Sequence, residues 1–174
     1  MLDQPTIYKL KLLHPSIREQ VLDLYTNKIV PALTGDYFCR FSYTYRSFEE
    51  QDLLYAQGRT KLFDKDGRRL GIVTNAKGGE SYHNYGLAVD IVLISGKSAS
   101  WDTAKDWDKD GKSDWLEVVD VFRSAGWEWG GVWKFKDYPH VQFPTQYTTK
   151  QLLKKYNSGD TFIDKGDGIK YVNL

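Results

Sequence analysis

The sequence predicts one α+β domain in which helices pack on a small antiparallel sheet. The chain has 174 residues, the size of a single ordinary domain. Helical segments come first and are followed by strands and helices in mixed order, which favours α+β over the regular alternation of a doubly wound sheet. We expect one domain over residues 1–174, with its central part at about 40–145 and a C-terminal helix and strand at 148–174.

Four segments carry helix signals. The first runs from about Pro15 to Ile29, because proline suits a first helical turn and apolar residues recur on one face. The second begins at Ser47, where the sequence Ser-Phe-Glu-Glu matches a capping box, and it stops before Gly58. The other two helices are expected over residues 114–125 and 148–157.

Strand signals are concentrated later in the chain. The run LAVDIVLI over residues 87–94 is typical of a buried strand with one acidic residue inside it. Shorter strands are expected at 127–129 and 140–143, and an edge strand at 168–173. Residues 59–82 form a long polar loop, and loops of that length in a compact domain are often functional.

Composition excludes several function classes. The one cysteine, Cys39, rules out an internal disulfide and any multi-cysteine metal site, and the three histidines limit a transition-metal site to three imidazoles. The net charge of +1 gives no reason to expect nucleic acid as a partner. No stretch approaches the ~20 apolar residues of a membrane helix. Lys9 and Lys11 interrupt the apolar N-terminal segment, so we expect no classical signal peptide.

Two histidines and one aspartate lie in an unusual context. Asp90 sits inside the apolar run of its strand, where a buried carboxylate is costly unless it is paired or binds a metal. His83 precedes that strand, and His140 begins a later apolar segment. Two histidines and one carboxylate are typical of a catalytic zinc site, which leaves a fourth position for water. Asp137, shortly before His140, is placed to act as general base.

Without a comparison to known proteins, each of these residues and several others also fit a structural role. A single histidine at the start of a strand is more often structural, and Asp90 fits equally an ion pair with an arginine in the core. Arg46, directly before the second predicted helix, fits an anion-binding role or an ordinary surface position. Trp133 and its neighbouring tryptophans fit either the wall of a peptide groove or core packing. His14, before a helix start, is expected to be a local cap.

Separated motifs resemble the D-alanyl-D-alanine carboxypeptidase family of zinc peptidases. The segment from Ser81 to Asp90 has the pattern S-x-H-x-x-G-x-A-x-D, and D-x-P-H follows at residues 137–140. The likeness is strongest to the branch of L-alanyl-D-glutamate endopeptidases, which includes phage endolysins and bacterial wall hydrolases. It extends over Tyr-Arg-Ser at 45–47, Gly-Arg-Thr at 58–60 and Val-Thr-Asn at 73–75.

The resemblance implies a fold and a role for particular residues. The fold is that of hedgehog and DD-peptidase proteins. By this resemblance zinc is bound by His83, Asp90 and His140. Asp137 is the catalytic acid and base, and Arg46 stabilises the oxyanion that develops on the substrate.

Three further residues are expected at the substrate site. Ser81 and Gln51 would line it, by the same resemblance. Trp133, just before Asp137, is expected beside the groove.

A second metal loop is indicated before the third predicted helix. Residues 106–117, DWDKDGKSDWLE, match the calcium-loop pattern D-x-D-x-D-G-x₅-E. No helix is clear before the loop, so the pattern predicts an EF-hand-type calcium loop in a different setting, with a solvated acidic turn as the alternative. The expected ligands are the carboxylates of Asp106, Asp108, Asp110, Asp114 and Glu117 and the backbone carbonyl of Lys112.

The leading hypothesis is a zinc peptidase that hydrolyses the peptide stem of peptidoglycan between L-Ala and D-Glu. One alternative is a D-alanyl-D-alanine carboxypeptidase or dipeptidase with the same metal set. Another is a zinc-containing binding module without catalysis, against which the intact Asp137 argues. We expect a monomer that carries Zn²⁺ and Ca²⁺, is made in the cytoplasm and acts on the cell wall.

Overall fold

The computed structural model describes residues 2–174, and its central feature is an antiparallel sheet with the strand order β1-β2-β5-β4. A third short strand, β3, pairs with the end of β2, and a separate two-stranded sheet joins β6 to β7. The antiparallel sheet with helices packed on it confirms the predicted α+β class. The strands are β1 (Tyr37–Tyr43), β2 (Ala88–Ser95), β3 (Ser98–Ser100), β4 (Glu128–Trp129), β5 (His140–Gln142), β6 (Thr161–Ile163) and β7 (Lys170–Val172).

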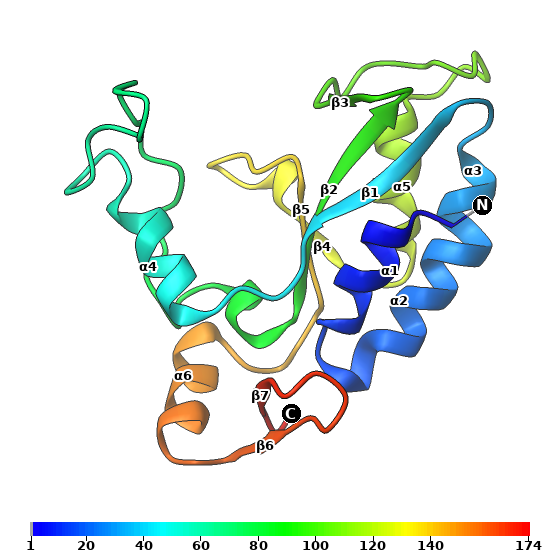
Figure 1. The fold of residues 1–174 in the computed structure, drawn as a ribbon. Helices are drawn as coiled ribbons and strands as arrows, with labels where there is room; N and C mark the ends of the chain where they lie inside the picture. Colours follow the sequence, from blue (N-terminus) through cyan, green and yellow to red (C-terminus); the bar gives the residue numbers. More distant parts are fainter. Residues whose placement is uncertain (1) are drawn as a thin grey trace.

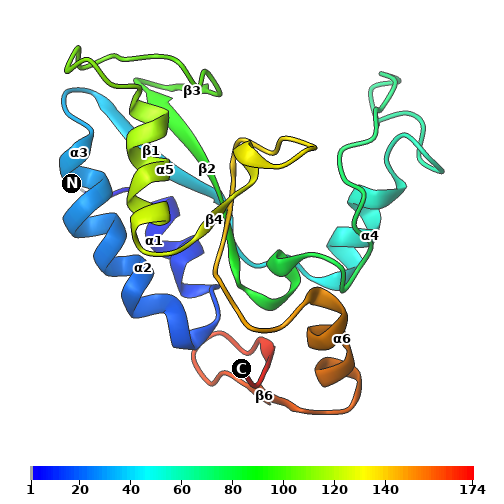
Figure 2. The same cartoon turned by 180° about the vertical axis from the view of Figure 1, so that it is seen from behind.

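The helices gather in two places, as Figure 1 and the reverse view in Figure 2 show. One group, α1 (Gln4–Lys11), α2 (Arg18–Leu24), α3 (Val30–Ala32) and α5 (Asp114–Ser124), covers one face of the sheet. The other two, α4 (Phe48–Ala56) and α6 (Thr149–Asn157), stand apart from that group. Short turns complete the set: η1 (Pro15–Ile17), η2 (Tyr25–Ile29), η3 (Tyr82–Tyr85) and η4 (Gly130–Val132).

The hydrophobic core lies between the sheet and the first group of helices. In β2 the side chains of Val89, Ile91 and Leu93 belong to this core, together with Val118 of α5. Side chains alternate between the two faces of a strand, so Asp90 points to the face that the helices leave free. The one acid inside the apolar run therefore lies on the face that is open to a substrate.

Strand β5 extends the same arrangement. It pairs antiparallel with β2 and places His140 directly opposite Asp90. Val141 belongs to the core, so His140 and Gln142 point to the same free face as Asp90. Strand pairing thus brings together residues that lie far apart in the sequence.

Most predicted elements are present with shifted bounds. The capping box at Ser47 is confirmed, and α4 follows it. The helix predicted over 15–29 begins as a 3₁₀ turn and continues to Ala32 through a π-helical turn. Helix α1 and strand β1 were not predicted. The C-terminal strand β7 pairs with β6 and does not join the edge of the main sheet.

Helix α4 and the segment 57–80 form an arm that projects from the rest of the molecule (Figure 1). Arg59 holds the arm together, because its Nη1 donates to the carbonyl of Thr74 at 2.9 Å and its Nη2 to Asn75 Oδ1 at 3.0 Å. The long polar loop predicted at 59–82 makes up most of this arm. No helix among residues 2–174 combines the length and apolar character needed to cross a membrane.

Candidate active site

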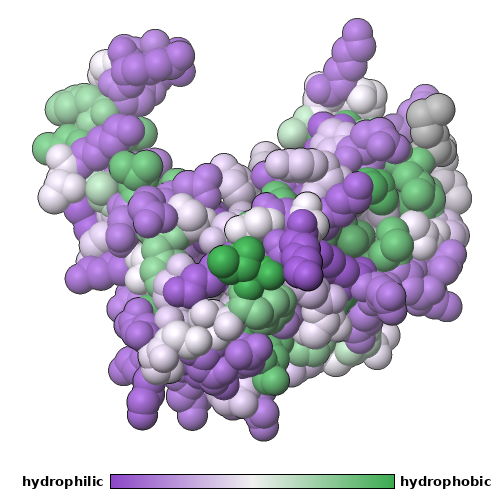
Figure 3. All heavy atoms as spheres, turned by 60° about the horizontal axis from the view of Figure 1, so that its bottom comes forward, coloured by the Kyte–Doolittle hydropathy of each residue, from purple (hydrophilic) through white to green (hydrophobic). Residues whose placement is uncertain are grey.

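A cleft of about 930 Å³ opens on the free face of the sheet. Figure 3 shows the surface hollowed between two projecting parts, of which the left one is the arm. The cleft is lined by residues from the arm, η3, β2 and the segment that leads into β5. Among them are seven of the residues singled out from sequence: Arg46, Ser81, His83, Asp90, Trp133, Asp137 and His140.

The turn η3 presents His83 to the cleft. Ser81 caps this turn, since its Oγ accepts from the backbone N–H of His83 at 3.3 Å. His83 Nδ1 lies 2.7 Å from the carbonyl oxygen of Thr44. A carbonyl only accepts, so Nδ1 carries the hydrogen and Nε2 keeps its lone pair. The side chain is 2% exposed, which leaves it one orientation.

A second chain of hydrogen bonds orients His140. Glu128 on β4 accepts from the Gln142 amide nitrogen at 2.7 Å, which turns the Gln142 oxygen toward His140. His140 Nε2 lies 3.1 Å from that oxygen and therefore donates to it. Nδ1 is then the nitrogen with the free lone pair. Partners that hold the far side of an imidazole in this way are the usual support of a metal-binding histidine.

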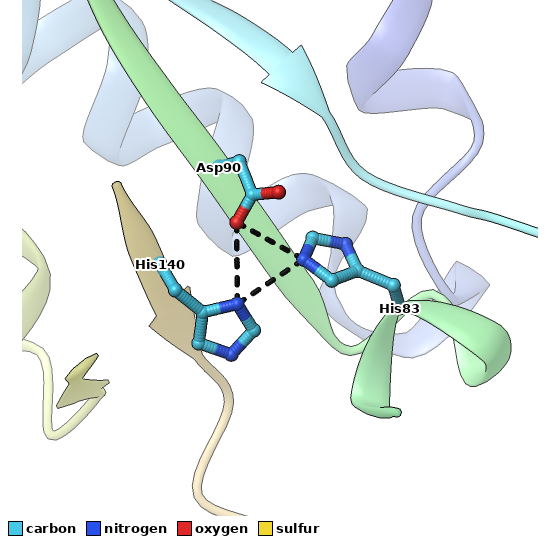
Figure 4. Close-up of side chains that lie close together, drawn as sticks. All are labelled: His83, Asp90 and His140. Atoms are coloured by element: carbon cyan, nitrogen blue, oxygen red, sulfur yellow. Dashed lines mark hydrogen bonds and ion pairs between the residues drawn. The ribbon is translucent and has the colours of Figure 1, made fainter. Parts of the chain in front are cut away.

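The three side chains meet in a triangle (Figure 4). His83 Nε2 lies 3.1 Å from both Asp90 Oδ1 and His140 Nδ1, and His140 Nδ1 lies 3.2 Å from Asp90 Oδ1. Three atoms that each offer a lone pair face one another, and this arrangement requires a cation among them. Ligands at about 2.0–2.1 Å from a tetrahedral zinc ion lie roughly 3.3 Å apart. The spacing and the donor set both fit zinc.

The charges in the triangle depend on one another. Burial opposes ionisation of Asp90, but His83 and His140 outweigh it and hold the pKa of the Asp90 carboxyl well below its usual range. Burial likewise lowers the pKa of His140, and the hydrogen bond and charge of Asp90 raise it above the ordinary value. The ionised carboxylate thus stabilises a positive charge beside it, from a proton or a metal ion.

Arg46, just after β1, reaches the same carboxylate from another side. Its Nη2 lies 3.6 Å from Asp90 Oδ2, the oxygen that faces away from the histidines. The guanidinium group lies over the ring of Tyr43 at 4.8 Å and donates from Nη1 to Gln51 at 2.9 Å. The ion pair between Asp90 and an arginine, which the sequence left as an alternative to metal binding, is therefore present. Asp90 makes it while its other oxygen contacts both histidines.

Gln51 does not line the cleft, which corrects the prediction for this residue. Its side chain is fully buried, and its amide nitrogen donates to the carbonyl of Ala76 at 2.8 Å. Its oxygen accepts the Arg46 hydrogen bond. Because all of its polar atoms are used inside the protein, Gln51 connects α4 to the arm and holds Arg46 in position.

Asp137 lies in the turn that leads from η4 to β5. Its N–H donates to the carbonyl of Gly130 at 3.0 Å, and its own carbonyl accepts from the His140 N–H at 3.2 Å. Gly130 permits this close approach, because a Cβ there would lie 2.5 Å from the Asp137 oxygen. Burial raises the pKa of the Asp137 carboxyl. His140 counteracts this rise, and the negative charge of Asp90 adds to it. A raised pKa suits a group that takes up and releases a proton.

Aromatic side chains form much of the remaining wall. Trp133 lines the cleft as predicted, with its ring centre 5.3 Å from that of His140. Trp101 and Phe135 also line it, although they are 56% and 79% exposed. Sequence reasoning missed these two. Each is a large aromatic residue between polar neighbours, a pattern that by itself does not separate a buried from an exposed position.

The residues of the predicted calcium loop lie between β3 and the first turns of α5. Their carboxylates form two groups that share one member, with all ligand atoms of a group within 4.8 Å of one another. Lys112 lies in the same loop, and its ammonium group reaches only one of the acids, Asp110, at 3.9 Å. The groups are Asp106, Asp108 and Asp110, and Asp108, Asp114 and Glu117.

A family comparison agrees with the geometry of the cleft. Residues 74–143 match the model of a family described as D-alanyl-D-alanine carboxypeptidase. Over this segment the chain is similar to that family. The matched segment contains the complete triangle and Asp137, and the resemblance predicted from separated motifs is confirmed.

Individual relatives carry more specific names. The chain is 56% identical over 100 residues to the peptidoglycan L-alanyl-D-glutamate endopeptidase CwlK of Bacillus subtilis strain 168, covering 56% of this chain and 56% of that protein. It is 42% identical over 103 residues to the L-alanyl-D-glutamate peptidase of Listeria phage A118, covering 54% of this chain and 34% of that protein. The matches thus span just over half of one curated relative and about a third of the other.

A solved structure was also matched. The L-Ala D-Glu endopeptidase ChiX of Serratia marcescens aligns with a TM-score of 0.49 and 23% sequence identity. The alignment covers 82% of this chain and 89% of that chain.

Proposed function

We propose that this chain is a zinc-dependent peptidase that cleaves the stem peptide of peptidoglycan between L-Ala and D-Glu. The observation that carries the proposal is the triangle of His83, Asp90 and His140, with its ligand atoms 3.1 to 3.2 Å apart, in one cleft with Asp137 and Arg46. The names of both curated relatives support the choice of bond. This substrate places the action of the chain at the cell wall.

The metal triangle, Asp137 and Arg46 then have separate roles in the reaction. A zinc ion held by the triangle would supply a Lewis acid that lowers the pKa of water and polarises the scissile carbonyl. Asp137 accepts the proton that the attacking water loses and returns it to the leaving amine, and its raised pKa suits both steps. Arg46 donates hydrogen bonds to the oxyanion that develops on the carbonyl oxygen.

The wall of the cleft supports a peptide substrate. Trp101, Trp133 and Phe135 provide apolar surface on which an extended chain can lie. Ser81, whose Oγ caps η3, also borders the cleft and offers a polar contact. A long open cleft with a few polar groups at its floor is the usual form of a substrate site.

Digestion of purified peptidoglycan tests the proposal, with the new peptide termini identified by mass spectrometry. Zinc-loaded protein should generate new D-Glu amino termini. Asp137→Asn should reduce the rate by about 10²–10⁴-fold, the usual contribution of a general base, while it still binds one zinc ion per chain. The matched control is Asp120→Asn, which removes the same charge from an exposed position on α5 and should leave the rate unchanged.

Two other outcomes would contradict the proposal in different ways. Release of D-Ala would identify a D-alanyl-D-alanine carboxypeptidase, the activity in the description of the matched family. Absence of any cleavage by protein that carries one zinc ion per chain would leave a metal-containing binding module.

A further inference from the structure

The chain carries a second set of carboxylates that the proposed peptidase site does not use. They lie in the segment that connects β3 to α5 and in the first turn of α5. None of the five acids lines the cleft. Asp108 belongs to both carboxylate groups, so five acidic side chains surround one small region.

The decisive feature of this region is the environment of Asp114. Its side chain is fully buried at the start of α5. One oxygen, Oδ2, accepts from the backbone N–H of Trp107 at 2.7 Å. The other, Oδ1, has no hydrogen-bond partner among residues 2–174. A buried carboxylate oxygen without a partner is costly, and Asp114 belongs to the carboxylate group that includes Asp108 and Glu117.

Glu117, about one helical turn after Asp114, also has a buried oxygen, Oε2, without a partner within the described part of the chain. Burial and the nearby acids raise the pKa of both carboxyls: Asp108 and Asp106 act on Asp114, and Asp110 and Asp108 act on Glu117. The ammonium group of Lys112 is 70% exposed and lies 3.9 Å from Asp110, and its charge partly opposes the rise for Glu117. Among residues 2–174 no salt bridge links Asp114 or Glu117 to a basic side chain.

The ligand atoms and the backbone indicate which cation fits. All candidate ligands are oxygen atoms, which favours calcium or magnesium over zinc. Gly111 has φ +94° at the sharp turn of the loop, the position at which EF-hand loops require glycine. The acids occupy positions 1, 3, 5, 9 and 12 of a twelve-residue loop. Six or more oxygens in a flexible arrangement suit calcium, whereas magnesium demands a stricter octahedron.

We propose that this region binds one Ca²⁺ ion through the carboxylates of Asp106, Asp108, Asp110, Asp114 and Glu117 and the backbone carbonyl of Lys112. The unpartnered oxygens of Asp114 and Glu117 become ligands, and the repulsion among the acids is removed.

The ion would fasten the connecting segment to the domain. Asp108 already accepts from Thr34 Oγ1 at 3.0 Å, and Trp107 stacks on Tyr37 at 5.1 Å. The same segment begins at Trp101, which lines the cleft. Calcium therefore ties the start of α5, the start of β1 and one wall of the cleft together. Its expected effect is on stability, separate from the chemistry at the zinc site.

Isothermal titration of Ca²⁺ into metal-stripped protein that has been reloaded with one equivalent of zinc tests the proposal. We expect one Ca²⁺ per chain with a Kd of about 10⁻⁶–10⁻⁴ M. Saturation should raise the Tm by roughly 5 °C or more. Asp114→Asn and Glu117→Gln should each weaken binding by at least about tenfold and reduce the Tm shift. Without calcium, Asp114→Asn should be no less stable than the parent, because it removes an unpaired buried charge.

The matched control is Asp120→Asn, which makes the same charge change at an exposed position of α5 outside the loop and should bind calcium as the parent does. If Asp114→Asn or Glu117→Gln fails to fold, Asp110→Asn provides the same test from an exposed position. Absence of binding at ~10 mM Ca²⁺, above the weakest known loop affinities, would overturn the proposal. So would loop variants with parental affinity. Neither outcome depends on peptidase activity.

Discussion

At the scale of single residues, the metal triangle depends on which nitrogen of each histidine carries the hydrogen. The Thr44 carbonyl decides this for His83, and the Gln142 oxygen decides it for His140. Sequence identified Asp90, because an acid inside an apolar run is conspicuous by itself. It did not identify Gln142 or Glu128, since their roles follow from the pairing of β4 with β5.

Gln142→Leu should weaken zinc binding about 10–100-fold, the usual effect of losing a partner that orients a ligand. The change removes the acceptor for His140 Nε2 and leaves the three ligands in place. Competition with a chromophoric chelator measures the affinity. Gln146→Leu, at an exposed position nearby, is the control. Equal zinc affinity in both variants would show that His140 needs no such support.

At the scale of elements, predictability depends on whether the signal is local. The cap of α4 is a set of hydrogen bonds within four consecutive residues, so Ser47 marked the start of this helix correctly. Thr148 makes a capping box of the same kind at the start of α6. Helix α1 buries only Thr6 and Leu10, which is too little apolar periodicity to detect. Strand β1 contributes Cys39 and Phe41 to the core, and Arg40 and Ser42 alternate with them. This alternation is typical of a half-buried strand, so a local signal was present and the prediction missed it.

The turn η3, which carries His83, ends at a glycine with two constraints. Gly86 has φ +66°, and a Cβ there would lie 2.6 Å from the backbone nitrogen of His14. Gly86→Ala should therefore lower the free energy of unfolding by about 2–4 kcal/mol. Gly126 has φ +87°, and a Cβ there would meet nothing within 4 Å, so Gly126→Ala should lower it by only about 1 kcal/mol.

Urea denaturation of both glycine variants measures the two losses. The difference between them isolates the close approach of Gly86 to His14, because both positions share the left-handed backbone. Equal losses would mean that the chain near His14 moves aside without cost, and that backbone conformation alone explains the glycine.

At the scale of the whole molecule, His14 joins the N-terminal helices to the C-terminal sheet. It caps η1 as expected, accepting from the Ser16 N–H, and its Nε2 lies 3.0 Å from the carbonyl of Val172 on β7. A carbonyl only accepts, so the native ring donates from Nε2 and accepts at Nδ1. Burial, assisted by Arg18 and opposed by the Val172 hydrogen bond, lowers the pKa of His14 below 6.5.

Acid should therefore destabilise the protein through His14. The unfolded chain binds a proton at this residue more readily than the folded chain, so stability rises with pH in this range. The contribution is fully present above the unfolded value of about 6.5 and is lost as pH falls through the lower folded pKa. His14→Asn keeps a capping acceptor but does not titrate. The free energy of unfolding of the parent relative to this variant should decline from pH 7 to pH 5 in urea titrations, and a constant difference would contradict the assignment.

The sequence by itself determined the α+β class, the helix caps, the metal-site residues and the acidic loop, because each rests on a local pattern or on a motif with its own spacing. Tertiary structure decided how these residues act together. Strand pairing set Asp90 opposite His140, and burial turned Gln51 from a wall residue into a support for Arg46. Packing left one carboxylate oxygen of Asp114 without a partner among residues 2–174. These outcomes depend on contacts between distant segments, and only a folded chain brings such segments within hydrogen-bonding distance.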